Sequence, residues 1–86
     1  MDFIKCKGYF NELATDDFYV CASLVDYVAI EERQNEYALN IYGLDKGFLG
    51  TVYRYDAYDD LADVMDKLIQ YLSAINNNAP FNAWDK

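Results

Sequence analysis

The stretch YALNIYGLDKGFLGTVYRY, residues 37–55, carries the clearest structural signal in the chain. Large side chains at Tyr37, Leu39 and Ile41 alternate with small or polar ones, as a half-buried strand requires. The segment 48–55 is rich in β-branched and aromatic residues, which is typical of a second strand. We therefore expect a β-hairpin over about residues 37–55.

The connection between these two strands contains Asp45, Lys46 and Gly47. A three-residue hairpin loop commonly places glycine in the left-handed backbone conformation. The sequence therefore predicts that Gly47 takes this role.

A helical period follows the hairpin. Apolar residues recur at intervals of four, three, four and three, which marks one face of an α-helix over about residues 59–75. Asp59 or Asp60 can cap its start, and the run 76–78 followed by Pro80 ends it. The remaining residues, 76–86, form a short C-terminal tail. The apolar residues of the expected helix are Leu61, Met65, Leu68, Leu72 and Ile75.

The N-terminal half supports two interpretations. A helix over part of residues 13–31 fits a stripe that includes Phe18, Cys21 and Val25, and this is the reading we favour. Alternatively, the β-branched and aromatic residues of 18–32 extend the antiparallel sheet. Either way the fold class is α+β, with a small antiparallel sheet packed against the C-terminal helix.

Length and composition indicate one folded domain over residues 1–86. The chain is 53% hydrophobic and 17% aromatic, which makes disorder improbable despite a net charge of -8. It shows no signal-peptide pattern and no apolar run of membrane-span length, so we expect a cytoplasmic protein. Cys6 and Cys21 are expected to be reduced and buried, although one bridge between them stays open as an alternative.

The acidic balance bears on the class of partner. A net charge of -8 repels nucleic acid and anionic membranes and attracts basic protein surfaces. We therefore expect no direct nucleic-acid binding. The plainer interpretation is that the charge keeps a small protein soluble.

Five aspartates lie within residues 55–66, and most of them share one side of the expected helix. At 100° per residue, four fall opposite Leu61, Met65 and Leu68. Steps of i to i+4 are about 6 Å along the axis, comparable with the path between phosphates on one nucleic-acid strand. Like charges so placed disfavour a helix by roughly 0.2–0.5 kcal/mol per pair, which points to a binding role. The alternative is an ordinary solvated face, since the helix dipole favours acids in the first turns and a charged outer side is typical of an amphipathic helix. The four are Asp56, Asp59, Asp63 and Asp66, and Asp60 lies beside them.

Further acids and two tyrosines extend the candidate partner-binding set. Carboxylates among aromatic rings suit arginine, which pairs with carboxylates in bidentate fashion and stacks on rings. These additional candidates are Tyr55, Tyr58, Glu31, Glu32 and Glu36.

The sequence contains few of the residues and motifs that enzymes use for catalysis. It contains no histidine, so serine–histidine and cysteine–histidine nucleophile systems are excluded. Gly43, Gly47 and Gly50 belong to the hairpin, not to a phosphate-binding loop, and the aspartate run lacks the spacing of an EF-hand. We expect no enzyme activity, no cofactor and no metal site.

In size, charge, tyrosine content and the run YDAYDDLADVMD, the chain resembles small acidic inhibitors encoded by phages and mobile elements. These include anti-CRISPR and antirestriction proteins and inhibitors of DNA-repair glycosylases. The resemblance implies a non-catalytic inhibitor, acting in the host cytoplasm, that occupies the basic DNA- or RNA-binding site of a CRISPR effector or restriction enzyme. The alternative is a small structural or regulatory accessory subunit, including a homodimer, that binds through its sheet edge or through Phe81 and Trp84 in its tail.

Overall fold

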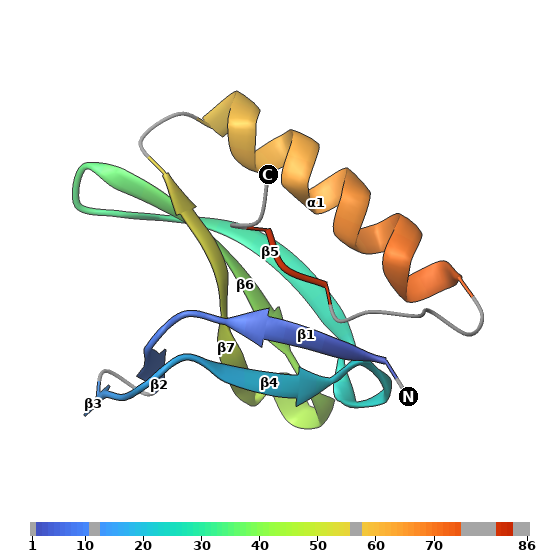
Figure 1. The fold of residues 1–86 in the computed structure, drawn as a ribbon. Coiled ribbons are helices and arrows are strands. Elements are labelled where there is room, and N and C mark those ends of the chain that lie inside the picture. The colour runs from blue at the N-terminus through green and yellow to red at the C-terminus, as the bar shows by residue number, and fades with distance from the viewer. Residues whose placement is uncertain (1, 11–12, 56–57, 75–80, 84–86) are drawn as a thin grey trace.

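The computed structural model describes residues 2–10, 13–55, 58–74 and 81–83 (Figure 1). It confirms the α+β class: antiparallel sheets are followed by one long helix near the C-terminus. The elements, in chain order, are β1 (Phe3–Cys6), β2 (Tyr9–Phe10), β3 (Leu13–Ala14), β4 (Phe18–Cys21), the 3-10 turn η1 (Ala22–Leu24), β5 (Tyr27–Arg33), β6 (Glu36–Tyr42), the 3-10 turn η2 (Leu44–Lys46), β7 (Phe48–Tyr55) and α1 (Tyr58–Ser73).

The largest sheet of the described chain is the antiparallel meander β5-β6-β7. The predicted hairpin is its β6–β7 half. Leu39 and Ile41 are fully buried, as the alternation predicts, while Asn40 between them is on the other face. The pairing of β6 with β7 shifts register beside Asn40 and beside Tyr42, so this half of the sheet carries bulges.

A second pair of strands lies against the meander. β1 and β4 pair antiparallel, with Ile4 opposite Val20. At the end of β1 the Lys7 amide donates to the Thr51 carbonyl at 2.8 Å, which joins this pair to β7. The fully buried Ile4 side chain lies in the interior between the two layers.

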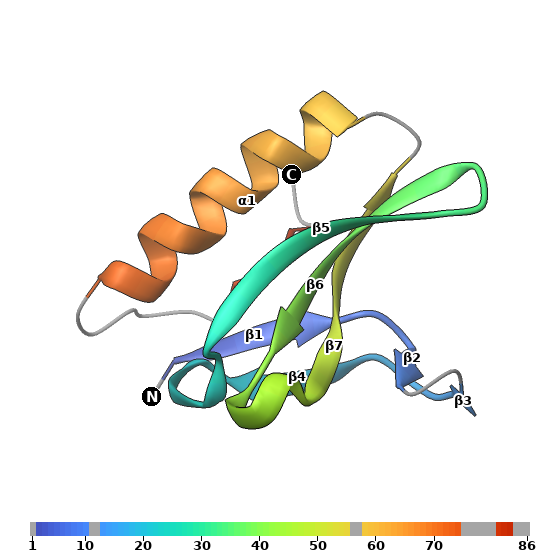
Figure 2. The same ribbon diagram turned by 180° about the vertical axis from the view of Figure 1, so that it is seen from behind.

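Helix α1 crosses the meander and closes the core from the other side (Figures 1 and 2). Leu61 and Leu68, two turns apart, are fully buried, and Val64, Met65 and Leu72 pack beside them. This confirms the predicted apolar face of the helix. The buried side chains of the described residues are Ile4, Cys6, Val20, Leu39, Ile41, Val52, Tyr53, Leu61 and Leu68.

The described part of the tail folds back on the chain. The Lys5 amide donates to the Phe81 carbonyl and the Phe81 amide donates to the Phe3 carbonyl, both at 2.8 Å. The Phe81 ring also packs against Tyr71, with ring centroids 5.6 Å apart. Phe81 therefore serves this chain's own fold, while Trp84 lies outside the described residues.

The favoured helix over residues 13–31 is wrong. The segment forms β3, β4, the single 3-10 turn η1 and most of β5. Phe18 and Val20 are aromatic and β-branched, and β1 supplies the partner strand that a reading of this segment alone does not reveal. Strand pairing with residues far away in the sequence therefore overrides the weak helical stripe.

The predicted conformation of the hairpin loop is also wrong. Gly47 has an ordinary extended backbone, with φ -69° and ψ 126°. Positive φ values of 59° occur instead at Asp45 and Lys46. The loop is longer than three residues, because the Gly43 amide donates to the Gly47 carbonyl at 2.8 Å and closes it from outside.

The predicted helix boundaries are nearly correct. Helix α1 begins at Tyr58 and ends at Ser73, compared with the expected range 59–75. Asp59 and Asp60 occupy its first turn, where acids interact favourably with the helix dipole. Ile75, the asparagine run 76–78 and Pro80 lie outside the described residues.

Candidate functional site

Three of the four aspartates of α1 stand on the side of the helix that faces away from the sheet. Because Leu61 and Leu68 point into the core, the opposite side faces outward. Asp59, Asp63 and Asp66 lie on that side, and all three are exposed. We call these three residues the acidic face. Asp56, expected to belong to it, lies outside the described residues.

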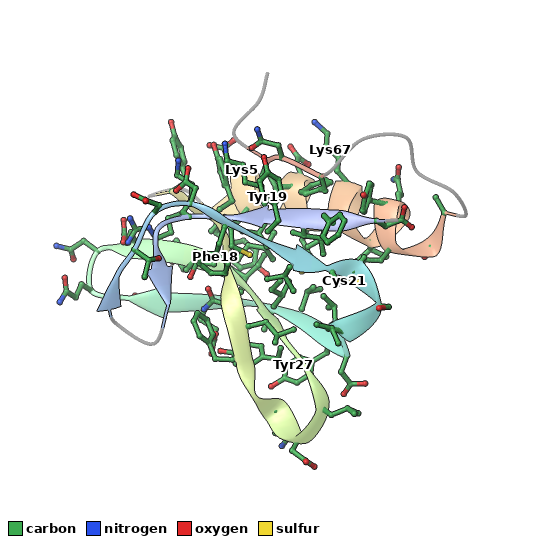
Figure 3. The ribbon with its side chains drawn as sticks, turned by 60° about the horizontal axis from the view of Figure 1, so that its bottom comes forward. Lys5, Phe18, Tyr19, Cys21, Tyr27 and Lys67 are labelled. Carbon is green, nitrogen blue, oxygen red and sulfur yellow. The ribbon has the colours of Figure 1, made fainter. Side chains whose placement is uncertain are left out.

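Among the described residues, no ion pair includes an aspartate of the acidic face. Between described residues, ion pairs join Lys5 and Lys7 to Asp17 at 3.9 and 3.3 Å, and Arg54 to Glu36 at 3.7 Å. None of them includes an aspartate of α1. Lys67, on the same helix, extends outward from it (Figure 3).

Asp60 belongs to a different surface. It lines a groove of about 540 Å³ between α1, the end of β7 and residues 81–83. Asp63 lies on the rim shared by this groove and the acidic face. The groove combines acidic, aromatic and apolar surface with one lysine, and its lining residues are Tyr53, Tyr55, Asp60, Asp63, Val64, Lys67, Phe81, Asn82 and Ala83.

The two predicted tyrosines are on the surface close to the start of α1. Tyr55 is 45% exposed and stacks on Tyr53, with ring centroids 6.1 Å apart. Tyr58 is 52% exposed and meets Tyr37 edge to face at 5.6 Å. The structure therefore brings Tyr55 together with Asp60 and Asp63 in one groove.

The predicted glutamates of the β5–β6 hairpin lie apart from the acidic face. Glu31 shares its sheet face with Asn40 and Tyr42, which is the face turned away from the core residues of β6. Glu36 pairs with Arg54. Glu32, the third of these glutamates, is exposed.

Sequence reasoning missed a polar network on this outer face of the sheet. The Tyr42 hydroxyl and the Asn40 Nδ2 group, the latter at 2.7 Å, both donate to Glu31 Oε1. The Thr51 hydroxyl donates to Asn40 Oδ1 at 2.7 Å. Partial burial of the hydroxyl and its bond to Glu31 raise the pKa of Tyr42 to about 12. Only the register of β5, β6 and β7 brings these four residues together, so no sequence motif marks them.

The described side chains contain no group of three or more potential metal ligands from His, Cys, Asp and Glu. Cys6 and Cys21 are both free, Cys6 buried and Cys21 partly exposed. No helix in the described part of the chain has the length and apolar character needed to cross a membrane.

Comparison with known proteins adds no relative: no family model, no curated protein and no solved structure matches this chain.

Proposed function

We propose that this chain is a non-catalytic acidic binding protein that inhibits a nucleic-acid-binding enzyme by occupying its basic DNA- or RNA-binding site. The observation that carries the proposal is the acidic face: three exposed carboxylates on one side of a helix, none of them paired with a lysine or arginine among the described residues.

The spacing of these carboxylates supports mimicry of a polyanion. From Asp59 through Asp63 to Asp66 is seven positions, or about 10 Å along the helix axis, in steps of about 6 and 4.5 Å. Phosphates on one strand rise by about 3.4 Å per nucleotide, with a longer path along the backbone. A cleft lined with arginine and lysine to receive phosphates therefore fits such a row.

The fold supports the same proposal because it holds the acidic face rigidly. Leu61 and Leu68 anchor α1 in the core, so the three aspartates keep their relative positions without a partner. A preorganised surface loses less conformational entropy on binding than a flexible acidic tail. The overall charge of -8 adds long-range attraction to a basic site.

The test is competition for the nucleic-acid site of the proposed partner class. Restriction enzymes and CRISPR effectors are each incubated with a labelled oligonucleotide, and its displacement by this protein is followed by fluorescence anisotropy at several salt concentrations. We expect displacement by the wild-type chain, weaker at high salt because the charges are exposed.

A charge-matched pair of variants makes the test specific. Asp59→Asn/Asp63→Asn/Asp66→Asn removes the acidic face, while Asp16→Asn/Asp26→Asn/Asp45→Asn removes three exposed acids elsewhere and leaves the same net charge. We expect the first variant to lose displacement about tenfold or more and the second to lose much less. Equal losses would show that only net charge matters and would reject the acidic face as the binding surface.

A further inference from the structure

Strand β5 has an edge that no described strand covers. It pairs with β6 over seven residue pairs, from Tyr27 opposite Tyr42 to Arg33 opposite Glu36. It is the outer strand of the order β5-β6-β7, and no backbone hydrogen bond from another described segment reaches its far side. Helix α1 runs alongside it in both views of the ribbon (Figures 1 and 2).

The register shows which backbone groups point away from β6. Arg33 and Glu36 face each other across the two-residue loop 34–35, so they form the narrow hydrogen-bonded pair that closes the hairpin. Hydrogen-bonded pairs then alternate along the antiparallel ladder. The N–H and C=O groups of Val28, Ile30 and Glu32 therefore point outward from the sheet.

Of the features that usually prevent strand addition, this edge has charged side chains but no lysine, proline, bulge or short length. Natural edge strands are protected by lysine, proline, bulges or short length. β5 has seven residues, contains neither lysine nor proline, and pairs with β6 without a register shift. Beside β5, the side chain of Ile69 of α1 is 43% exposed. Ile69 lies on one flank of the helix, and Val64 and Lys67, which line the groove by β7, lie on the opposite flank. A strand added here gains both backbone hydrogen bonds and apolar contact.

The charges along the edge favour one occupant. Asp26, Glu31 and Glu32 are exposed on or next to β5, and Arg33 at the hairpin end is the first cation after them. A second copy pairing antiparallel about Ile30 would bring the two Glu31 residues to diagonal positions, about 7–8 Å apart, with like charge. Two chains of net charge -8 also repel each other at longer range.

We propose that β5 accepts an extended basic segment of a partner protein as an added strand. Its backbone bonds to Val28, Ile30 and Glu32, and its lysine or arginine side chains meet the acids of β5. This surface is separate from the acidic face of α1, so it does not depend on the function proposed above.

A defined peptide tests this surface directly. The ¹⁵N-labelled chain is titrated with a nine-residue peptide of alternating lysine and valine, and in parallel with the glutamate–valine peptide of the same length. We expect saturable amide shifts centred on β5, slower amide exchange at Val28, Ile30 and Glu32, and little binding of the acidic peptide. Shifts centred on α1 instead of β5, or no saturable binding, would overturn the proposal.

Two substitutions at one position separate backbone bonding from charge. Glu32→Pro removes an outward N–H while leaving the bonds to β6 in place, because edge strands tolerate proline there. Glu32→Gln keeps that N–H and removes only the charge. We expect peptide affinity to fall about tenfold with proline and about two- to threefold with glutamine. Equal affinities for the two variants would show that β5 does not bond to the peptide backbone.

Two further measurements keep the result clear even if the proline variant unfolds. A lysine–valine peptide with N-methyl groups at alternate residues cannot form the strand bonds, so it should not bind the wild-type chain. The Asp59→Asn/Asp63→Asn/Asp66→Asn variant should bind the unmodified peptide like wild type. Any of three outcomes would overturn the assignment to a basic partner strand. They are retained binding of the methylated peptide, loss of peptide binding in the triple aspartate variant, and a dimer in sedimentation together with slowed amide exchange at β5.

Discussion

Two cysteine thiols occupy contrasting environments in this small protein. Burial raises the pKa of the Cys6 thiol to about 12, because the apolar core disfavours the thiolate. The Ser23 hydroxyl lies 3.1 Å from Cys21 Sγ and lowers the pKa of Cys21 by stabilising its thiolate. Although the sequence led us to expect both to be buried, only Cys6 is.

This contrast predicts selective thiol labelling. In the native protein at neutral to mildly alkaline pH, a disulfide reagent should modify Cys21 first and react with Cys6 only after unfolding. Peptide mapping of the labelled protein gives the assignment. In the control, Ser23→Ala, the pH at which Cys21 becomes reactive should move upward. Equal labelling rates for the two cysteines in the native state would contradict the buried position of Cys6.

At the scale of elements, the contact between β7 and the β1–β4 pair depends on Gly50. A Cβ atom added at Gly50 would lie 2.7 Å from Cys6 Sγ and 3.0 Å from the Phe18 ring. The absence of a side chain therefore allows β7 to approach the other strand pair closely. Gly47 differs, since its added Cβ would meet nothing closer than 3.5 Å.

We therefore expect Gly50→Ala to reduce the free energy of unfolding by about 1–3 kcal/mol through overpacking. The matched control is Gly47→Ala, which should be neutral or stabilising by up to about 1 kcal/mol, because φ -69° suits alanine. Urea denaturation of both variants measures the difference. If Gly50→Ala proved as stable as Gly47→Ala, the close approach of β7 to Cys6 and Phe18 would be incorrect.

The elements differ in how far the sequence predicts them. The alternation of Tyr37, Leu39 and Ile41 and the helical period of α1 are local, so the β6–β7 hairpin and the helix were expected in nearly the right places. The stretch 18–32 is ambiguous by itself, because Phe18, Cys21 and Val25 fit a helical stripe while its β-branched and aromatic residues also suit strands. The β4 part of it becomes a strand by pairing with β1, whose residues lie more than ten positions earlier in the chain.

On the scale of the whole molecule, several groups keep their protons in the folded state at alkaline pH. Burial raises the pKa of Cys6 from 9.0 to about 12, and burial with the bond to Glu31 raises that of Tyr42 from 10.0 to about 12. Burial also raises the pKa of Tyr71. The unfolded chain loses these protons first, so above pH 9 it binds fewer protons than the folded chain does.

The contribution of these groups to the free energy of unfolding should therefore be constant below pH 9. It should fall as the pH rises toward 12. Cys6 alone contributes a slope of up to about 1.4 kcal/mol per pH unit. Denaturation curves between pH 8 and 11 measure the decline. Tyr42→Phe should make the decline in the free energy of unfolding above pH 10 less steep. Tyr19→Phe, at an exposed position, should leave that decline unchanged. A stability that rises over this range would contradict the protonated state of these groups in the fold.

The residues of the candidate site also differ in how far the sequence predicts their positions. The acidic face is a property of one helix, so the rotation of about 100° per residue is enough to predict that Asp59, Asp63 and Asp66 share its outward side. The positions of Asp60 and of Glu31 depend on neighbours from other elements. Asp60 faces a groove with Tyr55 of β7, and Glu31 bonds to Asn40 and Tyr42 of β6.

The amino-acid sequence by itself determined the fold class, the hairpin, the helix and the outward row of aspartates. Each of these depends on side-chain periodicity within a single element, which neighbouring residues set. Only the tertiary structure decided that the described N-terminal segments pair as strands, that Phe81 pairs with β1, and that no described strand pairs with the outer edge of β5. The physical reason is that backbone pairing in a sheet joins residues distant in sequence, and no local pattern records which strand finds which partner.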